Sequence, residues 1–390
     1  MIETASGVGI YSDTVLTFNG LEHIYKSVDK LVVGDVICIS RKHTFPEDNI
    51  KLDFVHNKPK MATNTKEVTI PNRFSADLAE WLGYLIANGS VSENFIKMSS
   101  NSELLRGNFN KLTRKIFNVD GVTIKCEGKC TDITIFSVVI KKFLDYLSGG
   151  WVTARFKKVP EGVVRGTLES QRKFIKSLFD CDGSYNRGEL EYSTASESLA
   201  RGIQQILFKF GIVSFIKRDY AKEYPDHTYW KLYVRGAECD KMFETVLIDS
   251  IKYTEHIVKK RNTNIDVIYG LQEHLREAIK MSRRQLGSNG AGVYVDNKGA
   301  RVRFVLSKNL STMNCKNISY EMLQKVYKDF TNAPDEQKKS VVNIAETIRE
   351  ILNNKYFYDL VVDLNGKTTL ETFESNSVFL ENSVKVLEAS

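Results

Sequence analysis

The chain has 390 residues, of which 42% are hydrophobic and 26% charged, with only 6 prolines. This composition excludes a disordered or fibrous protein and supplies apolar material for two or three packed domains. The formal net charge of +7 is compatible with a polyanionic partner but does not require one. No stretch approaches the roughly 18 consecutive apolar residues of a membrane span, and Met1–Ser12 lacks the features of a signal peptide. We therefore expect a cytoplasmic protein with no membrane partner.

The six cysteines are scattered along the chain, which fits reduced thiols better than a disulfide framework. Only Cys126 and Cys130 are close in sequence. They are compatible either with half of a zinc site or with a turn between strands. The turn is favoured because no second Cys/His pair with ligand spacing follows.

The first 72 residues have the pattern of short strands separated by turns. A strand is predicted at Thr14–Phe18, followed by a hairpin turn at Asn19-Gly20 and a further strand within Val32–Ser40. Residues 41–72 are polar and without periodicity, which is typical of a linker. A domain boundary is therefore predicted near residue 72.

From residue 73 onward the pattern alternates between helices and strands, and the same order occurs twice. Helices are predicted at residues 75–87, 103–117, 138–147, 171–181, 197–210 and 238–247, and strands at residues 95–98, 122–125, 132–136, 189–193, 213–219 and 229–234. The order predicts an internal duplication.

Superposing the two copies places Asn88 opposite Asp182, each at the end of a helix and each followed by glycine. Four small residues, Gly83, Ala87, Ser177 and Cys181, would allow the two helices to pack closely. The alternative interpretation is a pair of ordinary core helices with glycine C-caps.

The segments Leu82–Ser90 and Lys176–Ser184 resemble the paired motifs of the LAGLIDADG, or dodecapeptide, homing endonucleases. This resemblance covers residues 73–262 and implies a monomer with a duplicated αββαββα core and internal pseudo-two-fold symmetry. It further implies binding of double-stranded DNA on a saddle of strands, and hydrolysis with Mg²⁺ (or Mn²⁺) held at Asp182 and Asn88. Asn88 departs from the family pattern, which has an acidic residue at this position.

The same resemblance implies a catalytic lysine before the Val-Pro that leads into the second motif, and Lys157 is the match. The corresponding position after the second repeat is Lys259 or Lys260. A lysine near the developing charge on a phosphate would provide electrostatic stabilisation. The alternative is a contact to the phosphate backbone or a solvated surface lysine.

Near the end of the chain, Tyr358–Asp363 and Phe373–Ser383 resemble two sequence blocks of the protein-splicing inteins. The resemblance implies that Asp359 belongs to the splicing centre, that Asn382 cyclises and that Ser383 is the acceptor nucleophile. Glu381 stands where that family usually has histidine.

The first intein block is represented by Ser12–Val15, and counting back from Asp13-Thr14 puts the first intein residue at Gly9. Inteins carry Cys or Ser there, and glycine has no nucleophile. Ser6 is a candidate only if the block is longer than usual. Three explanations remain: a nucleophile removed to trap the precursor, a degenerate relic, or a split intein that needs a complementary fragment in trans.

Residues 263–355 match neither family, but they contain a series of basic residues: Arg276, Lys280, Arg283, Arg284, Lys298, Arg301 and Arg303. This pattern is compatible with an accessory DNA-binding module, and the alternative is a solvated charged face. In the duplicated region, Lys217, Arg218, Lys231 and Arg235 on predicted strands are expected to bind phosphates.

The predicted fold class is α+β, with a duplicated LAGLIDADG core inserted in a β-rich Hint (intein) splicing domain. The predicted parts are residues 1–72 (with 1–8 as flanking sequence), 73–262, 263–355, 356–382 and 383–390. The predicted function is a site-specific, metal-dependent homing endonuclease carried within an intein of impaired splicing. The alternative is a cleavage-deficient or nicking DNA-binding protein of the same fold.

Overall fold

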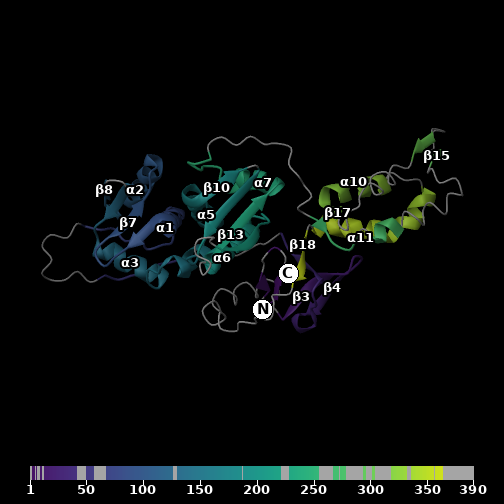
Figure 1. Ribbon diagram of the computed structural model, residues 1–390, viewed down its shortest axis with the longest axis horizontal. Helices are drawn as coiled ribbons and strands as arrows, with labels where there is room; N and C mark the ends of the chain where they lie inside the picture. Colours follow the sequence, from purple (N-terminus) through teal and green to yellow (C-terminus); the bar gives the residue numbers. More distant parts are fainter. Residues whose placement is uncertain are drawn as a thin grey trace. The chain divides into compact units, whose positions relative to one another are not determined.

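The computed structural model divides into two compact units, shown in Figure 1, which are described separately. Unit 1 comprises Met1–Lys42 and Arg261–Ser390, and unit 2 comprises His43–Lys260. The structure describes residues 2–4, 6, 9–10, 13–41, 50–56, 67–125, 130–186, 188–220, 228–253, 267–271, 273–277, 293–295, 301–303, 318–331, 335–354 and 356–362, and the statements below refer to these.

Unit 1 contains a six-stranded antiparallel sheet in the order β2-β1-β18-β5-β3-β4. Its elements are β1 (Ile2–Thr4), β2 (Gly9–Ile10), β3 (Thr14–Phe18), β4 (His23–Ser27), the short helix η1 (Val28–Lys30), β5 (Val36–Ile39) and β18 (Phe357–Val362). The two ends of the chain share this sheet, because Glu3 pairs with Val362 and Ile37 with Asp359.

The predicted hairpin at Asn19-Gly20 is confirmed. The Asn19 Oδ1 atom accepts the backbone N–H groups of Leu21 and Glu22 at 2.9 and 2.8 Å. Gly20 has φ +99°, a left-handed conformation that favours glycine. The turn leads into β4, which the sequence analysis did not predict.

The described elements of residues 263–355 are β14 (Val267–Ile268), β15 (Val293–Val295), β16 (Arg301–Arg303), β17 (Ile318–Ser319), α10 (Tyr320–Thr331) and α11 (Asp335–Asn354). Strands β15 and β16 pair with each other, whereas α10 and α11 pack onto the six-stranded sheet. Leu323, Val326 and Phe330 of α10 and Ile344, Ile348 and Ile351 of α11 share one core with Phe18, Val36 and Tyr358 of the sheet. The apolar faces of these two amphipathic helices thus cover the six-stranded sheet. The prediction of an accessory DNA-binding module in residues 263–355 stays a prediction.

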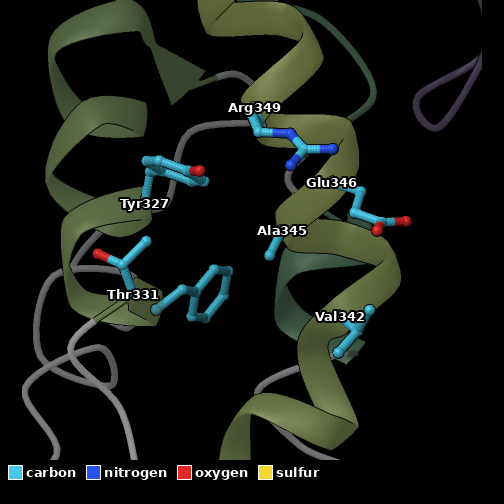
Figure 2. A pocket seen from close by; sticks show the side chains of 7 residues that line it. Tyr327, Thr331, Val342, Ala345, Glu346 and Arg349 are labelled. Atoms are coloured by element: carbon cyan, nitrogen blue, oxygen red, sulfur yellow. The ribbon is translucent and has the colours of Figure 1, made fainter.

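A hollow of about 280 Å³ lies between α10 and α11. Figure 2 shows Tyr327 of α10 facing Ala345 of α11 across it, with Arg349 at one end. The hollow belongs to the contact between the two helices.

Unit 2 contains the predicted duplication. Its first half consists of α1 (Ala76–Asn88), β6 (Gly89–Val91), β7 (Ile96–Ser99), α2 (Glu103–Phe117), β8 (Val122–Ile124), β9 (Asp132–Ile135) and α3 (Val138–Ser148). After η2 (Ala154–Phe156) and α4 (Glu161–Val164), its second half consists of α5 (Leu168–Asp182), β10 (Gly183–Asn186), β11 (Glu189–Thr194), α6 (Glu197–Lys209), β12 (Phe215–Tyr220), β13 (Thr228–Arg235) and α7 (Ala237–Thr245). The two antiparallel sheets have the same strand order, β6-β7-β9-β8 and β10-β11-β13-β12.

Serine and threonine caps explain why α1, α2, α3, α5 and α6 begin where they do. Ser75, Ser102, Ser137, Thr167 and Ser196 each accept the backbone N–H of the residue three positions later. Helix α2 has the predicted bounds because Ser102 caps its start and the left-handed Asn118 is its C-cap. Strands β6 and β10 were not predicted, since they are short and each begins at a glycine.

The predicted boundary at residue 72 falls inside unit 2. Residues 50–56 and 67–74 are hydrogen-bonded to each other, with Leu52 N to Asn72 O at 2.8 Å and Phe74 N to Ile50 O at 2.9 Å. Thr69 N also donates to Phe117 O, at the end of α2. The sequence of this segment is typical of a linker because it has no periodic hydrophobic pattern. The segment is held by backbone hydrogen bonds, which do not depend on such a pattern. Among the described residues, no helix is both long and apolar enough to cross a membrane.

Candidate active site

Helices α1 and α5 form the contact between the two halves of unit 2, which Figure 1 shows in blue and teal. A Cβ atom added to Gly83 would lie 1.9 Å from Ser177 Oγ and 2.8 Å from Phe174 O. The absence of a side chain at Gly83 therefore permits the close approach of the helices. As a result Asn88 and Asp182, the last residues of α1 and α5, lie at the same end of the helix pair.

The glycines that follow Asn88 and Asp182 are not left-handed C-caps. Gly89 and Gly183 have φ values of −92° and −68°, and the chain continues directly into β6 and β10. Their small size matters instead, since a Cβ at Gly89 would lie 2.3 Å from Leu85 O and one at Gly183 would lie 2.7 Å from Phe179 O. Both glycines cap their helices with an extended backbone, since the N–H of Gly89 donates to Leu85 O and that of Gly183 to Phe179 O.

Asp182 lies at the solvent-open end of the helix pair, between two lysines. Partial desolvation by the surrounding protein raises the pKa of its carboxyl group, and the ammonium groups of Lys157 and Lys252 oppose this rise. Asn88 is half-buried, and its side chain is hydrogen-bonded to the thiol of Cys181. Burial raises the pKa of that thiol, so Asn88 contacts a protonated sulfur.

Lys157 lies where the sequence analysis expected a site lysine. Its Nζ donates to Ile86 O at 2.5 Å and lies 5.6 Å from the centre of the Trp151 ring. Burial lowers the pKa of Lys157, and Asp182 opposes this effect. The Ser196 hydroxyl donates to the Lys157 carbonyl oxygen and so attaches α6 to this segment.

The second lysine of the site is Lys252, which the sequence analysis missed. Its Nζ donates to Gly183 O and lies 3.5 Å from Cys181 O. The predicted counterpart, Lys259, and the alternative Lys260 lie outside the described residues. A signal was present, because Lys157 follows the end of α3 by about as many residues as Lys252 follows the end of α7.

The second sheet presents a charge-balanced outer face. Lys231 lies 2.9 Å from Asp219 and 3.8 Å from Glu191, and Arg235 is paired with Glu189. Lys217 stands directly opposite Lys231 on this face. In the first sheet, Lys97 is paired with Asp132 at 3.1 Å.

Arg218 does not belong to the outer face of the second sheet. It stands opposite Trp230, one residue out of phase with the Lys217–Lys231 pair. Its guanidinium lies over the rings of Tyr220 and Trp230, at 5.2 and 5.8 Å from their centres. Arg218 therefore does not share a face with Lys217, Lys231 and Arg235, since adjacent residues of a strand face opposite sides. Phosphate binding by these four residues stays a prediction.

Unit 1 contains a second candidate site, between β1 and β18. Ser6 is fully buried, and both its backbone N–H (3.2 Å) and its hydroxyl donate to Asp359 Oδ2. Asp359 is itself buried, and Thr4 Oγ1 lies 3.3 Å from the Ser6 hydroxyl. Gly9, the predicted first intein residue, pairs with Glu3 in the β1–β2 ladder.

Asn382 and Ser383, the residues predicted to act in splicing, lie outside the described residues, as do Glu381 and Cys126. Cys130 is exposed. Within the described ranges, no cluster of three or more His, Cys, Asp or Glu side chains has the arrangement of a metal site.

Residues 169–264 match the family model of the LAGLIDADG-like domain. The chain therefore contains a LAGLIDADG-like domain, and the match begins in α5 and extends beyond α7.

This chain is similar to curated proteins whose names are unrelated to one another. One is an A-type ATP synthase protein of Pyrococcus abyssi, which is 29% identical over 322 residues, or 80% of this chain and 28% of the relative. The replication factor C small subunit of Methanocaldococcus jannaschii is 26% identical over 69% of this chain and 14% of the relative. A DNA gyrase protein of Mycolicibacterium flavescens is 30% identical over 34% of this chain and 26% of the relative. The chain thus spans less than a third of each of these relatives.

Similar solved structures include the homing endonuclease I-DmoI in complex with DNA and Mn, which is 16% identical with a TM-score of 0.36, over 47% of this chain and 99% of I-DmoI. Full-length DUF199/WhiA from Thermatoga maritima is 14% identical with a TM-score of 0.30, over 72% of this chain and 92% of that protein.

Proposed function

We propose that unit 2 is a homing endonuclease that hydrolyses double-stranded DNA at the paired ends of α1 and α5. The observation that carries this proposal is the meeting of Asp182, Asn88, Lys157 and Lys252 at one end of the helix pair. Cleavage of a duplex requires two phosphodiesters to be hydrolysed, and a duplicated domain supplies one helix end and one lysine for each.

The donor set fits a hard divalent cation such as Mg²⁺ or Mn²⁺. Asp182 offers a carboxylate and Asn88 an amide oxygen, and both are oxygen ligands of the kind such cations prefer. The site has one carboxylate fewer than the family pattern implies. A bound cation would supply Lewis-acid activation of the phosphate and lower the pKa of its water.

The two lysines are suited to stabilising charge. Both ammonium groups lie at helix C-termini, where they interact favourably with the helix dipoles, and both face Asp182. Each would stabilise the negative charge that develops on a phosphate oxygen during attack by water. Because burial lowers its pKa, Lys157 also releases a proton more readily than a solvated lysine.

The test is cleavage of a labelled duplex that joins the two coding sequences flanking the insert, incubated with Mg²⁺ or Mn²⁺. We expect the parent chain to cut both strands at that junction and the Asp182→Asn variant to cut neither. Unchanged cleavage by the Asp182→Asn variant would contradict the proposal. Binding of the duplex without cutting would favour the alternative function, a cleavage-deficient DNA-binding protein, which Asn88 supports.

We further propose that unit 1 is a splicing domain whose N-terminal reaction occurs at Ser6 instead of Gly9. The Ser6 hydroxyl would attack the Ala5 carbonyl carbon, forming an ester as the Ala5–Ser6 peptide bond breaks. The proton must move from the hydroxyl oxygen to the Ser6 nitrogen, and Asp359 Oδ2 contacts both of these atoms. A single carboxylate oxygen is thus positioned to accept the proton from one and deliver it to the other.

The pattern of relatives supports an insertion of this kind. Proteins named for ATP synthase, replication factor C and DNA gyrase share sequence with this chain over less than a third of their lengths. A module inserted in unrelated host proteins accounts for this pattern. Asn382 and Ser383 would complete the reaction at the other junction.

The test of the splicing proposal compares the parent chain with two single variants, Ser6→Ala and Gly9→Cys. Hydroxylamine attacks esters, so we expect it to release the segment before Ser6, and we expect Ser6→Ala to abolish this release. Gly9→Cys should have no effect on it. If cleavage persists in the Ser6→Ala variant, or if thiol-dependent cleavage appears only in the Gly9→Cys variant, the proposal for Ser6 is wrong and residue 9 is the position of the reaction.

A further inference from the structure

A cluster of buried charged residues lies beneath the candidate active site, in the contact between α1 and α5. Glu80, Lys176 and Asp180 are 4%, 2% and 1% exposed. The Lys176 ammonium lies 2.6 Å from Glu80 Oε1 and 3.4 Å from Asp180 Oδ2. Removing charged groups from water costs free energy even when they are paired. The burial of the Asp180 carboxylate therefore opposes folding.

The second oxygen of Asp180 is directed to the segment that carries Lys252. Asp180 Oδ1 accepts the Ser250 hydroxyl and lies 3.4 Å from the backbone nitrogen of Lys252. The Ser250 oxygen in turn accepts the backbone N–H groups of Lys252 at 3.2 Å and Tyr253 at 3.1 Å. These bonds fix the backbone of the residue whose ammonium reaches Gly183 O beside Asp182.

The first half of unit 2 has no such arrangement among its described residues. Ile86 occupies the position of Asp180 when the two helices are superposed, and Lys157 is held by the Ile86 carbonyl and the Trp151 ring. The two lysines of the site are therefore positioned by different means, one through a carboxylate and a hydroxyl, the other through a backbone oxygen and an indole.

We propose that Asp180 is a positioning residue that acts through Ser250 to hold Lys252 on the Asp182 side of the site. Loss of this support should slow cleavage of one DNA strand while the strand served by Lys157 is cut as before. This inference rests on the proposed nuclease function, and its first test is independent of cleavage.

The first test labels the lysines of the full chain with ¹³C-methyl groups and follows the resonances of Lys252 and Lys157 without DNA. Each resonance is assigned by a Lys→Arg substitution. Ser250→Ala leaves the buried charges intact, so the fold should be retained. It should move the Lys252 resonance and leave that of Lys157 in place, and Ser250→Thr should restore the original position. An unchanged Lys252 resonance in both Ser250→Ala and Asp180→Asn would overturn the proposal.

The second test measures single-turnover cleavage of each labelled strand with Mg²⁺. Ser250→Ala should slow one strand by roughly ten- to a hundredfold with unchanged DNA affinity, and Ser250→Thr should recover most of the rate. Asp249→Asn is the matched control, because Asp249 pairs with Arg172 and Lys173 in the same segment. Equal slowing of both strands, or slowing that follows DNA affinity, would contradict the inference. If the parent chain cuts no duplex, the nuclease proposal is wrong. The positioning of Lys252 by Asp180 and Ser250 is then tested by the Lys252 resonance alone.

Discussion

Asn88 is the residue that makes the two halves of the candidate site chemically unequal. It brings a neutral amide where Asp182 brings a carboxylate, and its side chain is engaged by the Cys181 thiol. A cation held between the two helix ends therefore meets one negative charge fewer on the α1 side.

We expect Asn88→Asp to increase cleavage of the slower strand by about tenfold or more, since an added anionic ligand raises metal affinity. The measurement is strand-resolved cleavage of a labelled target over a Mg²⁺ titration. Asp182→Asn should remove the remaining activity without loss of DNA binding. If the parent chain already cuts both strands at the same fast rate, Asn88 is a competent ligand and this interpretation is wrong.

Lys209 shows how a buried cation makes the stability of unit 2 depend on pH. Its Nζ donates to Val164 O at 2.9 Å, and burial lowers its pKa to about 8. The unfolded chain holds this proton up to about pH 10.4, so the unfolded state binds more protons than the folded state between pH 8 and that value. The contribution of Lys209 to stability is therefore unfavourable at neutral pH and improves as the pH rises.

Lys209→Met should raise the free energy of unfolding at pH 7 by about 1–3 kcal/mol and remove part of its rise between pH 8 and pH 10. Urea unfolding followed by tryptophan fluorescence measures this, because Trp81, Trp151 and Trp230 are the three tryptophans of the chain and all lie in unit 2. The same pH dependence in parent and variant would contradict the assignment.

At the scale of elements, the close packing of α1 on α5 determines the geometry of the site. Gly83→Ala would place a methyl group 1.9 Å from Ser177 Oγ, so the helices must separate. We expect a loss of about 1–3 kcal/mol in the free energy of unfolding, together with loss of cleavage. Gly107→Ala on α2 is the control. No atom lies within 4 Å of its added Cβ, so it should stabilise unit 2 by up to about 1 kcal/mol. Equal stability of the two variants would show that the helices are not in tight contact.

Helix α6 is connected to the site through its own cap. Ser196 accepts the N–H of Leu199 and donates to the Lys157 carbonyl, whereas Ser102 caps α2 without touching the site. Replacing either serine by alanine should cost about 1 kcal/mol of stability. Only Ser196→Ala should also slow cleavage. Parallel cleavage losses in Ser196→Ala and Ser102→Ala would show that the contact to Lys157 has no catalytic consequence.

The elements of unit 2 were predictable from the sequence because local signals define them. Serine caps and apolar spacing located the helices, and α2 was predicted with its observed bounds. The alternation of side chains along β12 also predicts that Lys217 and Arg218 face opposite sides of the sheet.

Helix caps and apolar spacing could not locate Lys252 or favour Ser6 over Gly9. Lys252 lies in a segment without periodicity, and its role depends on tertiary bonds to α5. Ser6 contacts Asp359 across almost the whole length of the chain, so the spacing of the nearby block pointed to Gly9 instead.

At the scale of the whole molecule, unit 2 is one continuous stretch while unit 1 is assembled from two separate ones. We therefore expect residues 43–260, expressed alone, to fold and to show the same tryptophan-detected unfolding midpoint as the full chain. The matched deletion, residues 1–42 joined by a short flexible linker to 261–390, should retain the six-stranded sheet, which circular dichroism and hydrogen exchange would report. A fragment 43–260 that stays unfolded would show that the two units depend on each other for stability.

The pairing of β1 with β18 has a consequence for the timing of events during synthesis. Strand β1 leaves the ribosome well before its partner β18, which carries Asp359 and emerges more than three hundred residues later. At translation rates of about 5–20 residues per second, unit 2 can fold in the interval while the sheet of unit 1 still lacks its central strand. During this time the Ser6 hydroxyl has not yet met Asp359. If Ser6 reacts as proposed, its reaction therefore waits until β18 has been made, and the proposed timing would keep the growing polypeptide from being cleaved early.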